Sequence, residues 1–329
     1  MPLILNSTTI HTILTDPSHL PTFSHTLLTG LLTPSTSPHR TSTTTPHGTT
    51  TLFMPCTQRS TTSLKTVSLP LNSPPNATIT LHSSHTGTLL AVLSGSEITA
   101  FRTALTSLLL VRARTQRGVR VRKVVIIGAG KQAEWVLRLL PWAAGCMAEE
   151  LDVGIYTRSG SESVKARIKI SGYRALERGE LEREVKSAEA LFCCTPSTEP
   201  VVPVEWVVEG EKRGRYVSLI GSYREDMVEV EPGLLVREGW SVCVDRKEAC
   251  FVESGEVIKS GIAREQVEEV AEVVERVQRE GELGVGDERW LGNVVFKCVG
   301  VAVMDLVVSE EIVRIAEETG VGEVIRNFE

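Results

Sequence analysis

The part of the chain that most constrains its fold is residues 123–140, where a β-branched apolar run leads into a glycine turn and then a helical apolar pattern. The order of strand, tight turn and helix is typical of the first half of a βαβ unit that binds a dinucleotide. In such a unit Gly128 allows the sharp turn, Gly130 lets the backbone approach a pyrophosphate, and Ala133 lets the helix pack closely on the strand. The N–H groups at the helix N-terminus then face the phosphates.

A second strand is expected over residues 151–156, and it ends in Thr157, Arg158 and Ser159. This strand end faces the adenosine ribose in a dinucleotide unit, where an acidic side chain suits a free 2′-hydroxyl and an arginine suits a 2′-phosphate. Arg158 between two hydroxyl residues therefore favours NADPH. The alternative is a solvated loop arginine, in which case NADH is accepted as well.

Length and composition restrict the class of protein. A chain of 329 residues is too long for one compact core and predicts two domains. A hydrophobic content of 41% and a net charge of −6 fit a globular protein with no nucleic acid or anionic membrane as a partner. The N-terminus has neither the basic region nor the apolar core of a secretory signal, so we expect a cytoplasmic location.

The cysteines and histidines give no sign of a disulfide framework or a metal site. The chain has 7 cysteines, an odd number, and most stand in apolar segments, so we expect reduced, buried thiols. It also has 7 histidines, all before residue 100 and without metal-ligand spacing, so no metal is expected.

Short strands broken by Pro, Gly, Asn and Ser follow one another before the dinucleotide motif. They are expected over residues 49–54, 64–69, 78–82 and 89–93 and predict an antiparallel sheet, followed by a helix over 96–114. Near the C-terminus, valines at helical spacing predict a helix over residues 264–278 that covers one side of the dinucleotide domain.

Two cations stand in unusual places within this pattern. Lys65 interrupts a strand of apolar and hydroxyl residues, and Arg102 lies in the first turns of a mostly apolar helix. A long cationic side chain in such a position either extends to the surface or binds an anion. Composition alone favours the surface location.

Motifs spread over most of the chain form a specific combination. They are Arg40-Thr-Ser, Leu52-Phe-Met-Pro55, Leu64-Lys-Thr-Val, residues 90–103 (LAVLSGSEITAFRT), Gly128-Ala-Gly-Lys-Gln-Ala133, Thr195-Pro-Ser-Thr-Glu-Pro200, Gly221-Ser-Tyr, Val244-Asp245 and residues 296–302 (FKCVGVA). In this combination the chain resembles the ornithine cyclodeaminase/mu-crystallin family of nicotinamide-dependent enzymes.

The resemblance implies an α/β fold with two domains and a homodimer. A Rossmann-type doubly wound domain would cover residues 116–300. An α+β domain with an antiparallel-rich sheet, formed by residues 1–115 and 301–329, would bind substrate and make the dimer. The chain would return to this second domain through a helix over residues 301–316.

The resemblance also implies a substrate site. Arg40 and Arg102 would bind the α-carboxylate of an amino or imino acid, while Lys65 completes the anion site and transfers a proton at the substrate nitrogen. Met54 and Gly300 would also contact the substrate. A guanidinium binds a carboxylate by two parallel hydrogen bonds, and two neighbouring arginines lower the pKa of a lysine. With the resemblance included, function outweighs the surface alternative for these cations.

The resemblance to the family also implies which residues contact the cofactor. The phosphate turn would consist of Gly128, Ala129, Gly130, Lys131, Gln132 and Ala133, and the ribose end of Thr157, Arg158 and Ser159. The loop Cys194, Thr195, Pro196 and Ser197 would follow the ribose and nicotinamide, with Val299 and Gly300 on the other side of the ring.

One departure from the family pattern affects the predicted reaction. Tyr223 stands where cyclodeaminase members carry an aspartate, and a phenol with an ordinary pKa of ~10 is a poor base at neutral pH. We therefore expect a reductase of small ketimine acids, such as a pyrroline- or piperideine-2-carboxylate. Ornithine cyclodeaminase and an alanine-dehydrogenase-like enzyme are the alternatives. A crystallin-like binding protein without activity is also an alternative, although the three cations argue against it.

Overall fold

The computed structural model describes residues 1–209, 214–283 and 288–326. The chain divides into two compact units: unit 1 consists of residues 1–102 and the segment from Val301 onward, and unit 2 of residues 103–300. The second division agrees with the predicted domain boundary at 300/301. The first lies at 102/103 instead of 115/116, because α3 (Gly95–Gln116) is one continuous helix whose first turns belong to unit 1.

Unit 1 is built on a mixed sheet with helices. Its elements are β1 (Leu3–Leu5), α1 (Ser7–Thr15), a 3-10 helix (Pro17–His19), α2 (Leu20–Leu32), β2 (Thr41–Thr44), β3 (Thr50–Gln58), β4 (Thr61–Leu69), β5 (Asn76–Ser83), β6 (Leu89–Ser94), the start of α3, α11 (Ala302–Thr319) and β15 (Glu323–Val324).

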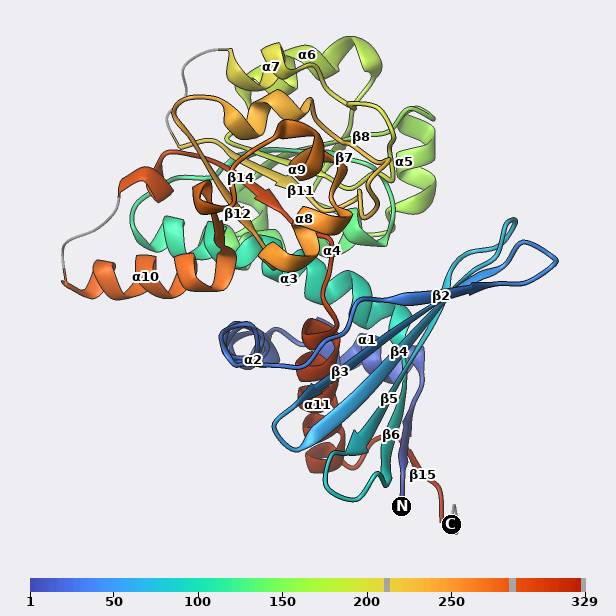
Figure 1. Cartoon of the computed structure of the whole chain (residues 1–329). Helices are drawn as coiled ribbons and strands as arrows, with labels where there is room; N and C mark the ends of the chain where they lie inside the picture. The colour runs from blue at the N-terminus through green and yellow to red at the C-terminus, as the bar shows by residue number, and fades with distance from the viewer. Residues whose placement is uncertain (210–213, 284–287, 327–329) are drawn as a thin grey trace. The chain divides into compact units, whose positions relative to one another are not determined.

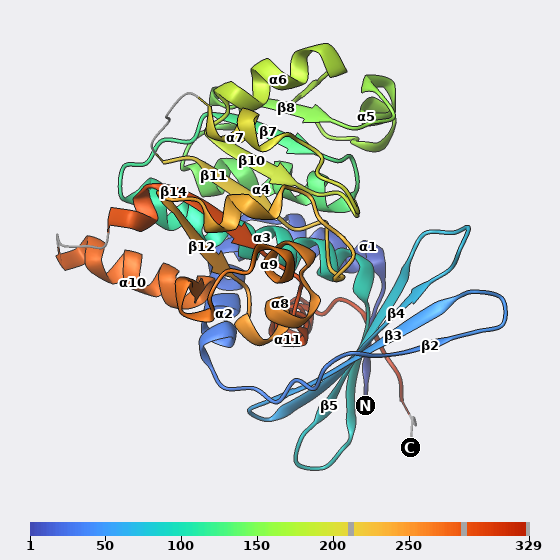
Figure 2. The same ribbon diagram turned by 45° about the horizontal axis from the view of Figure 1, so that its top comes forward.

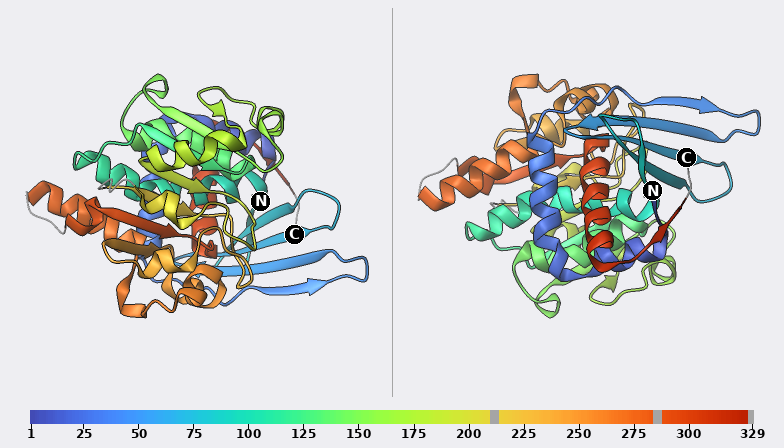
Figure 3. Two further views of the ribbon diagram at one scale, coloured as in Figure 1. Left: turned by 90° about the horizontal axis from the view of Figure 1, so that it is seen from above. Right: turned by 90° about the horizontal axis from the view of Figure 1, so that it is seen from below.

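The sheet of unit 1 has the strand order β15-β1-β6-β5-β4-β3-β2. Neighbours from β6 to β2 are antiparallel, as the turn-rich sequence predicts, while β1 pairs with β6 in parallel. Helix α11 packs against β3, β4, β5 and α2, and Figure 1 shows it lying along the face of the sheet. The right-hand view of Figure 3 shows α2 in blue and α11 in red, side by side. The predicted return helix is thus found, ending three residues later than expected.

Unit 2 is built on a parallel sheet. After the rest of α3 its elements are β7 (Lys123–Ile127), α4 (Lys131–Ala144), a 3-10 helix (Ala148–Glu150), β8 (Asp152–Tyr156), α5 (Ser161–Arg167), β9 (Arg174–Ala175), α6 (Arg178–Ser187), β10 (Ala190–Cys193), α7 (Val204–Val208), β11 (Tyr216–Leu219), a 3-10 helix (Pro232–Val236), β12 (Trp240–Val244), α8 (Lys247–Glu253), α9 (Gly255–Ser260), a 3-10 helix (Arg264–Gln266), β13 (Val267–Glu269), α10 (Val270–Leu283), a 3-10 helix (Glu288–Leu291) and β14 (Asn293–Lys297).

The strand order in unit 2 is β13-β12-β14-β11-β10-β7-β8-β9, and the paired neighbours are parallel. Figure 2 shows these strands side by side under covering helices. The chain runs from β7 outward to β9 and then returns to β10 on the other side of β7. The order therefore reverses between β7 and β10, and ligands of doubly wound folds bind at the carboxyl ends of the strands at such a point. The predicted Rossmann-type α/β class is confirmed.

The turn after β7 follows from its residues. Val124, Val125, Ile126 and Ile127 are buried, as in a central parallel strand covered on both faces. Gly128 has φ +114°, and a Cβ there would lie 2.8 Å from the carbonyl oxygen of Cys194. Only glycine allows this conformation and this approach of β7 to the loop after β10.

The helix predicted over residues 264–278 is partly wrong. Residues 264–266 form a 3-10 turn, Val267 to Glu269 pair with β12 as strand β13, and the helix begins only at Val270. The helix was predicted to begin too early because Val267 fits the helical valine spacing, while a short buried strand accepts a single valine equally well.

Two further sequence expectations concern membranes and thiols. Within the described residues, no helix combines the length and apolar character that crossing a bilayer requires. The cysteines all fall within the described ranges, where each is free of a disulfide and all except Cys146 are buried. Cys56, Cys193 and Cys243 lie in strands, and Cys250 lies in helix α8.

Candidate functional site

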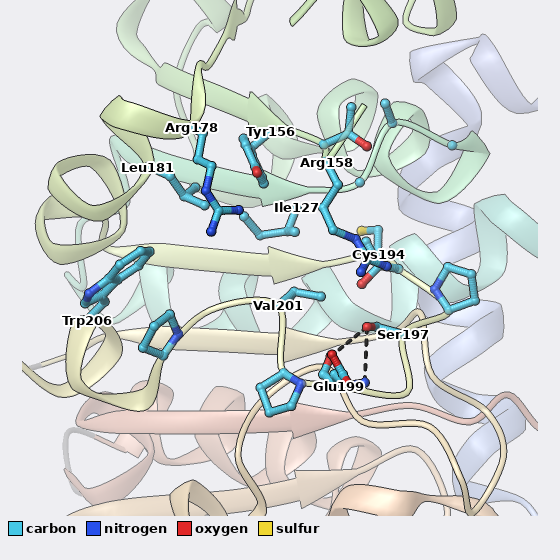
Figure 4. A pocket seen from close by; sticks show the side chains of 18 of the residues that line it. Ile127, Tyr156, Arg158, Arg178, Leu181, Cys194, Ser197, Glu199, Val201 and Trp206 are labelled. Carbon is cyan, nitrogen blue, oxygen red and sulfur yellow. Dashed lines mark hydrogen bonds between the residues drawn. The ribbon is translucent and has the colours of Figure 1, made fainter. Parts of the chain in front are cut away.

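A cavity of about 850 Å³ lies in unit 2 at the carboxyl ends of β7, β8 and β10, and Figure 4 shows it from close by. Its lining includes residues predicted to contact a cofactor: Gly128, Ala129, Gly130, Thr157, Arg158, Cys194, Thr195, Pro196 and Ser197. They come from three separate segments that the parallel strands bring to one edge of the sheet. The cavity therefore occupies the switch point that the strand order creates.

The phosphate turn has room for a ligand beside its backbone. Gly130 is the residue before the first turn of α4, and a Cβ at this position would meet no atom within 4 Å. The open space lies where the N–H groups at the helix start leave their hydrogen bonds unfilled within the helix. A phosphate or pyrophosphate fits these donors and the positive end of the helix dipole.

Three arginines contribute to the lining of the cavity. Arg158 follows β8, Arg167 ends α5 and Arg178 begins α6, and all three line the cavity. Figure 4 shows Arg158 and Arg178 extending into it. The position of Arg158 after a predicted strand marked it in the sequence, whereas Arg167 and Arg178 lie in no motif and were not predicted.

Some predicted cofactor residues do not line this cavity. Ala133 is fully buried in α4, where it packs against the sheet, and Lys131 and Gln132 belong to the same first turn. The Ser159 hydroxyl donates to Ser163 at 3.0 Å on the exposed side of the loop. Their predicted contacts with the cofactor stay predictions.

Val299 and Gly300, also predicted at the cofactor, are held by a buried carboxylate. The N–H of Gly300 donates to Oδ2 of Asp245 at 2.7 Å, and the N–H of Val299 donates to Oδ1 at 3.4 Å. The thiols of Cys250 and Cys298 also donate to Asp245, each at 3.2 Å. Asp245 belongs to the motif Val244-Asp245, but the sequence did not predict that its carboxylate holds residues 299–300, which are 54 and 55 positions away.

The cations of unit 1 lie around a carboxylate that sequence analysis did not assign to the site. Lys65 points inward from β4 with 2% of its surface exposed, in a row between Met54 of β3 and Ile79 of β5. Its Nζ lies 2.9 Å from Oδ1 of Asp305, and Nε of Arg102 lies 3.3 Å from the same oxygen. The surface alternative for Lys65 and Arg102 is therefore wrong, since both are buried.

Asp305 stands in the first turn of α11, where the helix dipole favours a negative charge. Its Oδ2 is buried and accepts no hydrogen bond from the described residues. The guanidinium of Arg102 also approaches the Met304 sulfur at 3.4 Å. The arrangement leaves one buried carboxylate oxygen able to accept a further donor.

Burial is the main cause that lowers the pKa of Lys65 to about 8; Asp305 opposes this shift, while the charges of Arg102 and Arg40 contribute to it. The predicted direction is confirmed, but its main cause is burial and not the neighbouring arginines. Arg40 is partly buried and close enough to act on Lys65. The structure thus brings Arg40, Lys65, Arg102 and Met54 together in unit 1.

The segment that departs from the family pattern lies in unit 2. The Arg224 guanidinium stacks over the Tyr223 ring at 5.9 Å from its centre, and it forms an ion pair at 3.0 Å with Asp226. Asp226 is exposed, and its pairing with Arg224 lowers its pKa. No carboxylate thus takes the place of the family aspartate at position 223 itself.

Comparison with known proteins places these features in one family. The sequence model of the ornithine cyclodeaminase/mu-crystallin family matches residues 45–320. Rat ketimine reductase mu-crystallin is 29% identical over 238 residues, which cover 71% of this chain and 67% of the relative. The match to the family model begins five residues after Arg40 and so does not include it. The predicted role of Arg40 in the substrate site is therefore supported by its electrostatic effect on Lys65.

Solved structures share the fold over nearly the whole chain. The Thermococcus litoralis Delta(1)-pyrroline-2-carboxylate reductase in complex with NADH and L-proline has a TM-score of 0.77 at 23% identity, covering 98% of this chain and 100% of that one. An archaeal alanine dehydrogenase dimer with bound NAD has a TM-score of 0.76 at 22% identity, covering 99% of both chains. The resemblance found from the sequence motifs is confirmed.

Proposed function

The chain belongs to the ornithine cyclodeaminase/mu-crystallin family, and on that basis we propose that it is an NAD(P)H-dependent reductase of small ketimine acids. The substrate class is a cyclic imino acid of the pyrroline- or piperideine-2-carboxylate type. The observation that carries this proposal is the buried Lys65, which lies with Arg102 on Asp305 and has a pKa of about 8. Such a group can lose and regain a proton near neutral pH.

The cavity of unit 2 fits a nicotinamide dinucleotide. Gly128 and Gly130 form a turn that leaves space at the start of α4, and the backbone N–H groups there would bind the pyrophosphate. The arginines at positions 158, 167 and 178 suit the 2′-phosphate of NADPH better than the bare ribose of NADH. When bound, the cofactor supplies the hydride that reduces the C=N carbon.

The cations of unit 1 suit the carboxylate of the substrate. Arg40 and Arg102 would bind it through charge-assisted hydrogen bonds, which fix the carbon that receives the hydride. Met54 beside Lys65 supplies apolar surface in the same row of the sheet. The predicted contact of Gly300 with the substrate stays a prediction; in unit 2 its backbone N–H is held by Asp245.

Lys65 would supply the proton that the nitrogen needs. Reduction adds a hydride to carbon and a proton to nitrogen, so an ammonium group beside the nitrogen balances the reaction. Asp305 keeps Lys65 positioned, and its second oxygen can accept a hydrogen bond from the N–H of the substrate or product. General acid catalysis of this kind contributes roughly 10²–10⁴-fold to a rate.

A cyclodeaminase reaction is less well supported by the same residues. It calls for a group that assists at the substrate amine, and Tyr223 replaces the aspartate that the resemblance places there. Nearby Asp226 is exposed and paired with Arg224. We therefore propose the reductase, working as a homodimer in the cytoplasm, in agreement with the dimeric state of the archaeal relative.

The test is to follow nicotinamide absorbance with NADPH, or with NADH, and a panel of cyclic ketimine acids, and separately with ornithine and with pyruvate plus ammonia. A reductase consumes one cofactor per molecule of cyclic amino acid formed. A cyclodeaminase releases ammonia from ornithine without net cofactor change, and that result would replace the proposal. Cofactor binding with no turnover of any substrate would instead support the crystallin-like binding protein.

A further inference from the structure

A buried carboxylate connects the loops after β10 and β11. Glu229 is fully buried, and its Oε1 accepts from the N–H of Thr195 at 2.7 Å and from the Thr195 hydroxyl at 3.2 Å. Its Oε2 accepts from the N–H groups of Gly221 at 2.8 Å and Ser222 at 3.2 Å. Both carboxylate oxygens are therefore occupied by donors from two loops at the same edge of the sheet.

The backbone of the same segment strengthens this connection. Val228 donates to the carbonyl of Ser197 at 2.8 Å, and Val201 donates to the carbonyl of Glu229 at 2.8 Å. A Cβ at Gly221 would overlap the backbone of Thr195, so the two loops meet in van der Waals contact. Thr195, Pro196 and Ser197 also line the cavity, and Figure 4 labels Ser197 among the lining residues. The carboxylate thus holds a loop that lines the cavity.

We propose that ionised Glu229 is a positioning residue, which holds the loop Thr195–Ser197 in the conformation that binds the nicotinamide cofactor. The inference rests on the proposed cofactor site and adds a group that does not touch the ligand. A carboxylate can accept all four hydrogen bonds, whereas a carboxylic acid carries a proton on one oxygen and has to release the donors facing it. Protonation of Glu229 therefore loosens one of the two loops.

The surroundings of Glu229 make this protonation relevant near neutral pH. Burial raises its pKa to about 7, with Lys297 of β14 opposing and Glu256 of α9 adding to the shift. Although burial alone would raise the pKa of Glu256, Lys297 and Ser222 hold it below its usual value. Burial raises the pKa of the thiols of Cys193, at the end of β10, and of Cys194, which follows it, well above their usual value. Compared with Glu256 and the two thiols, Glu229 is the group placed to titrate close to pH 7.

The inference is tested by titrating the full chain with NADPH at pH 6 and pH 8 and measuring the dissociation constant by fluorescence. In the native protein the constant should be about tenfold larger at pH 6, since most of the Glu229 population is then protonated. Glu229→Gln should bind more weakly than native at pH 8 and show a smaller change between the two pH values. The 2′-phosphate of NADPH titrates near pH ~6 in both proteins, so it cancels in the comparison.

The matched control is Glu225→Gln, the same chemical change at an exposed position on the same segment, which should behave as native. Hydrogen exchange of the Thr195, Gly221 and Ser222 amides in the protein without cofactor provides a readout that needs no ligand. The amides of at least one of the two loops should exchange faster, after correction for intrinsic rates, in Glu229→Gln and in native protein at pH 6.

Two results would overturn the inference while leaving the proposed function intact. One is a native dissociation constant that does not change with pH, and the other is a Glu229→Gln protein that keeps the native pH dependence, as expected if Glu229 only stabilises the fold. If the native protein binds neither NADPH nor NADH at any pH, the proposed function fails and the inference fails with it.

Discussion

Each unit of this protein buries a titratable group whose pKa is influenced by an opposite charge, and the two groups have opposite sign. In unit 1, Lys65 lies 2.9 Å from Asp305, and burial lowers its pKa to about 8. In unit 2, burial raises the pKa of Glu229 to about 7, and Lys297 opposes this shift. Removal from water favours the neutral form of either group, so two residues with very different ordinary pKa values come to titrate within a narrow range.

The partners of the two groups differ, and this difference separates their proposed roles. Within the described residues Lys65 donates to one acceptor, Asp305, and can direct its other protons elsewhere, which suits transfer of a proton. Glu229 accepts hydrogen bonds on both oxygens, which suits holding backbone in place. The comparison teaches that a shifted pKa does not define a role by itself; the number and direction of the hydrogen bonds do.

The largest expected effect comes from Lys65→Met, which removes the proton donor but keeps a long side chain in the strand. We expect kcat to fall by roughly 10²–10⁴-fold, because general acid catalysis is lost. Binding of NADPH should remain native, since the cavity belongs to unit 2. The measurement is steady-state turnover together with a fluorescence titration of NADPH. A variant with more than a tenth of native kcat would remove Lys65 from the chemistry.

Asp305→Asn should lower both stability and activity, because it leaves Lys65 and Arg102 buried without the carboxylate between them. Breaking a buried ion pair from one side costs about 3 kcal/mol of unfolding free energy. The same change at the exposed pair of Asp226 and Arg224 should cost less than about 1 kcal/mol. Urea unfolding of Asp305→Asn and Asp226→Asn measures both, and equal losses would contradict the contrast between buried and exposed pairs.

The pH dependence of turnover at saturating cofactor tests the proposed role of Lys65. Lys65 donates a proton only while it is charged, so kcat at saturating cofactor should decline above about pH 8, by roughly tenfold per pH unit. In Asp305→Asn the decline should begin at lower pH, because Asp305 raises the pKa of Lys65. A native profile that stays flat to pH 9 would show that another group donates the proton.

The smallest expected effect concerns cofactor choice. Arg158→Ala should weaken NADPH binding by about tenfold, the value of one lost charge-assisted hydrogen bond, and leave NADH binding nearly unchanged. The two cofactors serve as each other's control within one variant. An equal loss for both would mean that Arg158 holds the shared part of the dinucleotide, and preference for NADPH would then rest on Arg167 and Arg178.

Much of the architecture could be predicted because its signals are local. The β-branched run, the glycines and the following apolar helix lie within residues 123–140, and the antiparallel strands are marked by turn residues. The predicted cofactor loops meet because parallel strands bring their carboxyl ends to one edge. The boundary at residue 102 and the strand β13 were missed, since a continuous helix and a short valine-containing segment carry no local mark of either.

The site was predictable only as far as its motifs extended. Resemblance to the family identified Lys65, Arg40 and Arg102 as a group, yet not the carboxylate on which Lys65 and Arg102 converge. Arg167, Arg178 and Glu229 have no motif that marks them as neighbours of the cavity. Each is brought there by helices and loops whose course depends on packing.

What the amino-acid sequence determined unaided is the succession of strands, turns and helices, together with the residue types that bind a dinucleotide and a carboxylate. Tertiary structure alone decided which charges share a buried space. Lys65 and Asp305 are 240 positions apart, and Thr195 and Glu229 are 34 apart. Backbone preferences depend on a few adjacent residues, whereas the pKa of a buried group depends on water exclusion and on partners that only the folded chain brings within hydrogen-bonding distance.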